Sequence, residues 1–117
     1  MAKILIVDDS RTSRKILRTI LEGAGHEIIG EAVDGLEGVA KFKELAPEIT
    51  TLDITMPNLD GLEALKEIKK ENASAKVIMV TAAGQQNKMV EAIKSGASEF
   101  VTKPFEADEI IALIAKL

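Results

Sequence analysis

The sequence contains no cysteine, no tryptophan and no tyrosine, and it has only three phenylalanines. The lack of cysteine excludes a disulfide framework, a thiolate metal site and a cysteine nucleophile, and it fits the cytoplasmic location that we expect. The scarcity of aromatic side chains leaves little for the stacking of bases, and a net charge of −4 does not favour a phosphate backbone. Direct binding to nucleic acid is therefore not expected.

Long apolar runs are also missing from the sequence. The first apolar run, residues 4–7, ends at Asp8 and is too short for a signal peptide or a membrane span, so we expect no membrane association. The length of 117 residues, 46% of them hydrophobic, fits one domain with one sizeable core. We expect residues 1–117 to form a single, monomeric domain, and the start at Met1 favours a complete stand-alone protein.

Short apolar runs alternate with segments of helical spacing along the whole chain. The runs cover residues 4–7, 27–30, 49–52, 77–80 and 99–102. Those at 4–7 and 77–80 are apolar almost throughout, which is typical of central parallel strands that are buried on both faces. The runs at 27–30 and 99–102 are less apolar, so we predict that these strands lie at the edges of the sheet.

Apolar residues between and after these runs recur at helical spacing and predict five helices. Ser10, Asp34 and Asp60 are suited to cap three of them, the last two with a Glu three residues on, while Gly25 and Gly96 mark helix ends. Five strand–helix units predict an α/β fold with a parallel sheet, right-handed crossovers and helices on both faces. The apolar stripes are Ile16, Leu17, Ile20 and Leu21; Leu36, Val39, Ala40 and Phe42; Leu62, Leu65 and Ile68; Met89, Val90 and Ile93; and Ile110, Ile111, Leu113, Ile114 and Leu117.

Polar residues follow directly after four of the predicted strands. Asp8 and Asp9 follow the first run, Asp53 the third, Thr81 the fourth and Lys103 the fifth. In open parallel sheets, ligands bind beyond the carboxyl ends of the strands. If the first strand is central, these side chains converge on one pocket.

The residue types in this pocket indicate a particular chemistry. Clustered carboxylates repel one another unless a cation lies between them, and oxygen ligands without His or Cys suit Mg²⁺. A carboxylate that faces a metal ion, a Lys and a Thr is arranged to attack phosphorus, because the metal and the Lys neutralise the oxygens of the transferring group. An aspartyl phosphate is an accepted covalent intermediate.

Together these motifs resemble those of response-regulator receiver domains, from Lys3 to the last helix. Residues 53–57 and 84–86 are further similar to the stand-alone chemotaxis regulators. The resemblance implies a flavodoxin-like (βα)5 doubly wound parallel sheet with strand order 2-1-3-4-5. The matching motifs are Asp8-Asp9, Asp53, Met56-Pro57 with Asp60-Gly61, Thr81-Ala82, Gly96-Ala97 and Lys103-Pro104-Phe105.

The same resemblance implies a role for each residue at the metal. Asp53 is the nucleophile that accepts a phosphoryl group from a histidine kinase. Asp9, Asp53 and the backbone carbonyl of Thr55 ligate Mg²⁺ directly, and Asp8 acts through a metal-bound water. The chain catalyses only its own phosphorylation and dephosphorylation and is not otherwise an enzyme.

The resemblance also implies a conformational switch. Lys103 pairs with the phosphoryl group, Thr81 hydrogen-bonds it after moving inward, and Phe100 is the aromatic residue that follows this movement. The Lys103–Pro104 bond is expected to be cis. The changed surface, made by the fourth helix, fifth strand and fifth helix, would bind a downstream protein such as a flagellar switch protein, and a phosphatase is a further expected partner.

The sequence departs from common family members at three positions. Thr55 stands where Asn is frequent, and Ala83 is small and apolar, so neither offers an amide or carboxylate to orient a hydrolytic water. We therefore expect a long-lived phosphoryl group. Phe100 stands where Tyr is frequent and has no hydroxyl, so we expect it to be partly inward even without phosphate.

Three alternative functions remain open from the sequence. A haloacid-dehalogenase-type phosphatase also uses an Asp after a strand, but it needs a second Asp two residues on, where this chain has Thr55, and it needs a cap domain. A flavodoxin-like cofactor binder would have a Ser-, Thr- and Gly-rich first loop, whereas Asp8 and Asp9 would repel a phosphate. The chain could also be the receiver of a longer regulator with a DNA-binding output.

Overall fold

The protein alternates strands and helices in a single parallel sheet. The computed structural model describes residues 1–82 and 84–117. The sheet has five strands in the order β2-β1-β3-β4-β5, and every neighbouring pair is parallel. The predicted α/β fold and strand order are therefore confirmed, with β2 and β5 at the edges. The elements are β1 Lys3–Val7, α1 Arg11–Gly23, β2 Glu27–Ala32, α2 Gly35–Leu45, β3 Ile49–Asp53, α3 Gly61–Glu71, β4 Lys76–Thr81, α4 Gln86–Lys94, β5 Glu99–Thr102 and α5 Ala107–Lys116.

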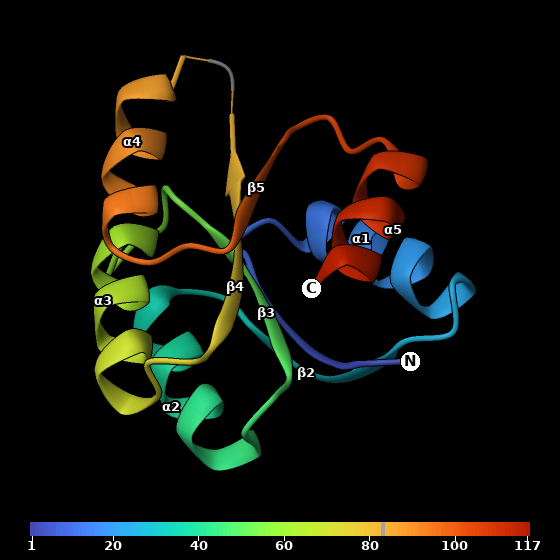
Figure 1. Cartoon of the computed structure of the whole chain (residues 1–117), viewed down its shortest axis with the longest axis horizontal. Helices are drawn as coiled ribbons and strands as arrows, with labels where there is room; N and C mark the ends of the chain where they lie inside the picture. The colour runs from blue at the N-terminus through green and yellow to red at the C-terminus, as the bar shows by residue number, and fades with distance from the viewer. Residues whose placement is uncertain (83) are drawn as a thin grey trace.

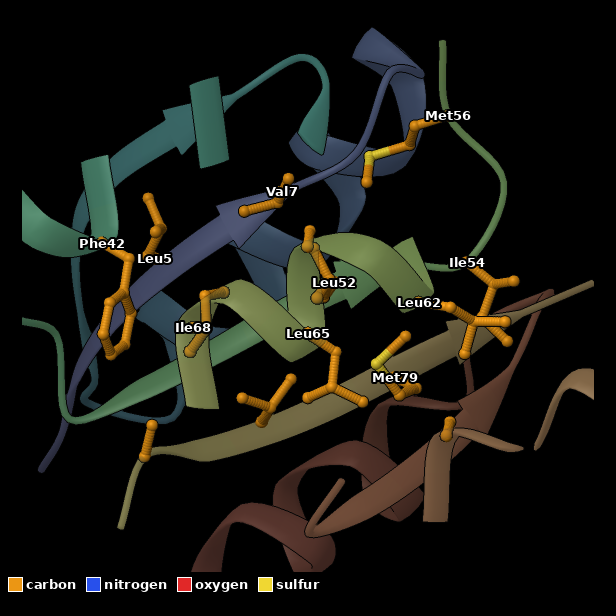
Figure 2. Close-up of a cluster of buried hydrophobic side chains, with 14 of the residues drawn as sticks. Leu5, Val7, Phe42, Leu52, Ile54, Met56, Leu62, Leu65, Ile68 and Met79 are labelled. Atoms are coloured by element: carbon orange, nitrogen blue, oxygen red, sulfur yellow. The ribbon is translucent and has the colours of Figure 1, made fainter. Parts of the chain in front are cut away.

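Helices cover both faces of the sheet, with α2, α3 and α4 on one side and α1 and α5 on the other (Figure 1). Successive side chains of a strand point to opposite faces, so Leu5 joins the core cluster under α2 and α3, while Ile4 and Ile6 join the cluster under α1 and α5. Figure 2 shows the first of these clusters, which includes Leu65 of α3 and Leu52 of β3. This double burial explains why β1 and β4 are apolar almost throughout.

Side-chain caps begin the first three helices, as the sequence predicted. Ser10 accepts a hydrogen bond from the Ser13 N–H, Asp34 from the Glu37 N–H and Asp60 from the Glu63 N–H. Each bond satisfies one of the backbone donors that a helix start leaves without a partner within the helix. These caps fix where the chain leaves the carboxyl edge of the sheet, which is the edge that carries the candidate site.

Some apolar residues of the predicted stripes lie outside the core. Ile16, Leu36, Val90 and Ile93 have exposed fractions of 46%, 58%, 55% and 54%. Two of these, Val90 and Ile93, lie on α4, so this helix presents apolar side chains to its outer side. In the part of the chain that the structure describes, no helix is long and apolar enough to cross a membrane.

Candidate functional site

A lysine joins the ends of three strands at the carboxyl edge of the sheet. Asp8 follows β1, Asp53 ends β3 and Lys103 follows β5. The Lys103 Nζ lies 3.0 Å from Asp8 Oδ2 and 3.2 Å from Asp53 Oδ2. The convergence that the strand ends predicted is therefore present for these side chains.

Asp9 completes a group of carboxylates with Asp8 and Asp53. One ligand atom from each of the three residues lies within 4.8 Å of the others. Asp8 and Asp53 are buried, whereas Asp9 is exposed. Three carboxylates beside one ammonium leave excess negative charge, and their oxygens are the donors that Mg²⁺ prefers. The residues present therefore fit a magnesium ion at this edge.

The pKa values of Asp53 and Lys103 reflect this excess negative charge. Burial, together with the negative charge of Asp8, raises the pKa of Asp53 to about 6, although Lys103 opposes the shift. Burial lowers the pKa of Lys103, but its hydrogen bond to Asp8 and the charge of Asp53 outweigh that effect, so its pKa is raised. The site thus holds the lysine charged and disfavours a third ionised carboxylate until more positive charge arrives.

Local hydrogen bonds fix the orientation of Asp8. Its Oδ1 accepts the Ser10 N–H at 2.8 Å, and its Oδ2 faces Lys103. Its backbone carbonyl accepts a hydrogen bond from Arg14 Nη1 at 2.8 Å. Both carboxylate oxygens of Asp8 are therefore engaged by the protein, and Asp9 is the exposed member of the pair.

An ion pair that the sequence analysis missed supports this loop. Glu31 of β2 accepts from Arg14 Nε at 3.1 Å and from Arg18 Nε at 2.7 Å. Burial alone raises the pKa of Glu31, but the two guanidinium groups outweigh it and lower that pKa. Glu31 lies one residue past the predicted strand at 27–30, and a glutamate at a strand end beside arginines of the preceding helix is the pattern that could have indicated the pair.

Thr81 does not reach the carboxylates in this structure. Its hydroxyl is buried and lies 3.5 Å from the Val101 carbonyl and 3.5 Å from Thr102 Oγ1, both on β5. Phe100 on the same strand is half-buried and packs against the core cluster under α3. The Lys103–Pro104 bond is cis, as predicted. The inward positions expected for Thr81 and Phe100 in the phosphorylated chain stay predictions.

Thr55 carries a contact that sequence reasoning also missed. Thr55 is exposed, and its hydroxyl accepts a hydrogen bond from the side-chain amide of Gln85. The Gln85 Oε1 in turn accepts the backbone N–H of Ala82 at 2.9 Å. Thr55 itself offers no amide or carboxylate, but the carboxamide of Gln85 lies beside it. The expected long lifetime of the phosphoryl group stays a prediction, and Ala83, the second residue on which it depends, lies outside the described residues.

Fold and site together define a class of protein. The sequence matches the family model for the response regulator receiver domain over residues 4–115. The chain belongs to this family, as its motifs indicated. The match extends over nearly the whole chain, so it favours the receiver over the phosphatase and the cofactor binder.

Individual relatives are regulators of chemotaxis. The chemotaxis protein CheY of Listeria monocytogenes is 49% identical over 116 residues, which cover 99% of this chain and 98% of that protein. CheY of Thermotoga maritima is 46% identical over 115 residues, covering 98% and 96%. A chain in the crystal structure of the CheX-CheY-BeF3-Mg²⁺ complex from Borrelia burgdorferi has a TM-score of 0.93 at 36% identity and covers 97% of this chain and 87% of that one. The narrower resemblance to chemotaxis regulators is thereby confirmed.

Proposed function

We propose that the chain is a phospho-switch that accepts a phosphoryl group on Asp53 from a histidine kinase in a Mg²⁺-dependent reaction. The observation that carries this proposal is the position of Lys103, whose Nζ lies 3.0 Å from Asp8 and 3.2 Å from Asp53. A nucleophilic carboxylate thus has a fixed cation beside it, where charge on a transferred group must be stabilised.

The chemistry assigns each side chain a defined part. A carboxylate oxygen of Asp53 attacks the phosphorus of a phosphohistidine, the P–N bond breaks, and its electron pair returns to the imidazole nitrogen. Lys103 then pairs with an oxygen of the bound phosphoryl group. Asp8, Asp9, Asp53 and the carbonyl of Thr55 would hold Mg²⁺, which supplies further charge neutralisation when bound.

The output of the switch is binding to another protein. The face made by α4, β5 and α5 carries the exposed Val90 and Ile93, and apolar groups exposed together often mark a partner site. Because relatives named CheY are chemotaxis proteins, we place the chain in chemotaxis, with a flagellar switch protein as the target. The Borrelia complex contains CheX together with CheY, which supports a second protein partner for this chain. A phosphatase is a further partner that we propose. The unit is residues 1–117, a monomeric receiver that acts only on its own phosphoryl group.

Acetyl phosphate tests the acceptor residue directly. With Mg²⁺, intact-mass spectra should show one phosphoryl adduct on the wild type and none on Asp53→Asn. Asp60→Asn is the matched control, because Asp60 is exposed and its carboxylate accepts the Glu63 N–H as the cap of α3, so this variant should still carry the adduct. EDTA should abolish labelling of the wild type. An adduct on Asp53→Asn, or full labelling in EDTA, would contradict the proposal.

A further inference from the structure

The side chain of Gln85 is directed away from its own helix. Gln85 is the N-cap residue of α4, yet its side chain makes no capping hydrogen bond, unlike the caps of α1, α2 and α3. Its carboxamide instead bonds Thr55 in the β3–α3 loop through Nε2 and the Ala82 N–H after β4 through Oε1. One side chain therefore bridges the chain segments that follow two central strands.

The strand ladder explains why the Ala82 N–H is available. The Ile54 N–H donates to the Val80 carbonyl at 3.1 Å, so the next donor on that side of β4 is Ala82, and its regular acceptor would be the Ile54 carbonyl. That carbonyl instead accepts the Gly61 N–H at 2.7 Å. Among the described residues, the Ala82 N–H has no backbone acceptor, and it donates instead to the Gln85 side chain.

Glycine at position 61 makes the hydrogen bond to the Ile54 carbonyl sterically possible. A Cβ at position 61 would lie 2.0 Å from the Asp53 carbonyl oxygen, so only glycine allows α3 to start this close to β3. The close approach gives the Ile54 carbonyl a partner in the Gly61 N–H, while the Ala82 N–H donates to the Gln85 side chain. The bridge by Gln85 therefore follows from the backbone arrangement around Asp53.

Thr81 is coupled to this bridge through a single peptide bond. Ala82 follows Thr81 directly, and the Thr81 hydroxyl faces β5 at 3.5 Å from the Val101 carbonyl. A backbone movement of Thr81 towards Asp53 also moves the Ala82 N–H that Gln85 holds. Thr55, at the other end of the bridge, lies in the loop that follows Asp53.

We propose that Gln85 is a positioning residue for Thr81. Its bridge between the Ala82 N–H and the Thr55 hydroxyl holds Thr81 in the outward position and so opposes capture of the phosphoryl group. This inference rests on the proposed function, because it names a residue that regulates the same site. It assigns Gln85 a role that is separate from the carboxylates and the lysine.

The variant Gln85→Met keeps the length of the side chain and removes both hydrogen bonds. Beryllofluoride with Mg²⁺ is the probe for phosphoryl capture, and the titrated signal is the Thr81 amide resonance in ¹⁵N NMR. Because a neutral hydrogen bond contributes modestly to a conformational equilibrium, the affinity should rise about three- to tenfold. Thr55→Val should raise it in the same direction, and the double variant should match Gln85→Met, because both changes break one bridge.

Asn87→Met is the matched control, since it removes an exposed carboxamide elsewhere on α4 and should leave the affinity unchanged. A second readout needs no metal or phosphoryl mimic. Exchange of the Ala82 amide hydrogen in the free protein should be faster in Gln85→Met than in the wild type and unchanged in Asn87→Met.

The outcomes separate the two proposals. A wild type that does not bind beryllofluoride would overturn the proposed function and this inference with it. Normal binding by the wild type, with unchanged or weaker binding by Gln85→Met, would overturn the inference alone, because a merely structural role predicts weaker binding. Unchanged exchange of the Ala82 amide in Gln85→Met would also overturn it, since the bridge would then not protect that donor.

Discussion

At the scale of single residues, Asp53 combines burial with a role that needs its ionised form. Burial and the nearby charge of Asp8 raise its pKa to about 6. A carboxyl group with such a pKa is ionised at neutral pH and remains a better nucleophile than an acid of ordinary pKa, because basicity and nucleophilicity rise together. The same shift carries a stability cost at neutral pH, which can be measured.

That cost predicts the pH dependence of stability in EDTA. The folded pKa of about 6 lies above the unfolded value of about 3.9, so the contribution of Asp53 is fully present below pH about 4 and is lost as pH rises through 6. Asp53→Asn should therefore gain stability relative to the wild type between these values, by about 1–2 kcal/mol at pH 7. Urea unfolding of both proteins at pH 4 and at pH 7 measures the difference in free energy of unfolding between Asp53→Asn and the wild type at each pH.

Magnesium provides the control for this prediction. A bound cation would stabilise the ionised carboxylate, so saturating Mg²⁺ should shrink or reverse the advantage of Asp53→Asn at pH 7. An Asp53→Asn protein that is no more stable than the wild type at pH 7 in EDTA would show that Lys103 already compensates the buried charge.

At the scale of single elements, the central strand β3 contains two buried polar side chains. Thr50 and Thr51 are buried, and neither hydroxyl has a hydrogen-bond partner among the described residues. A buried hydroxyl without a partner costs about 1–3 kcal/mol, and valine has nearly the same shape. β3 therefore contains two positions at which a polar atom weakens the strand that carries Asp53.

Replacing either residue by valine should stabilise the protein. Thr50→Val and Thr51→Val should each raise the free energy of unfolding by about 1 kcal/mol, measured by urea denaturation. Thr19→Val is the control, because Thr19 is exposed on α1 and its hydroxyl donates to the Lys15 carbonyl. It should change stability by less than about 0.5 kcal/mol. Destabilisation by the β3 variants would mean that those hydroxyls are satisfied in solution.

Element positions could largely be predicted from the sequence, whereas side-chain directions on the helices could not. The strand at residues 77–80 and the cap at Asp34 follow from local patterns, and the structure contains both. The stripe on α1 also predicted Ile16 as a core residue, yet Ile16 is 46% exposed while Arg14 turns towards β2. The direction of Arg14 depends on its ion pair with Glu31, a residue of β2. The periodicity of α1 alone does not include this residue.

At the scale of the whole molecule, some contacts of the site follow from the fold and could be predicted, whereas others depend on contacts between distant elements and could not. Asp8, Asp53 and Lys103 could be predicted to meet, because the ends of parallel strands converge whatever the loops do. The contact of Gln85 with the Ala82 N–H depends on a competition for one backbone carbonyl, and only three-dimensional coordinates contain that competition. The spacing of residues along the sequence does not predict contacts of this kind.

The fold also connects the site to the proposed partner surface. Thr81 ends β4 and contacts Val101 of β5, and the neighbouring Phe100 packs against the cluster that includes Ala92 of α4. A movement of Thr81 towards Asp53 would change the space beside Phe100, and hence the face on which Val90 is exposed. Phosphorylation can shift this equilibrium only through contacts that differ between the two states, and the Thr81 hydroxyl supplies such a contact.

The switch itself can be tested by labelling phenylalanine with ¹⁹F. A hydrogen bond from Thr81 to a charged phosphoryl oxygen contributes about 1.5–3 kcal/mol, which shifts a population ratio about ten- to a hundredfold. Phe100 should therefore move from a mixture of rotamers to a mainly inward one with Mg²⁺ and beryllofluoride, while Thr81→Ala should remove most of that response. Phe42, which is a buried residue of α2, serves as the internal control and should not respond. A Phe100 resonance that ignores beryllofluoride in the wild type, or responds equally in Thr81→Ala, would separate these two residues as independent parts of the fold.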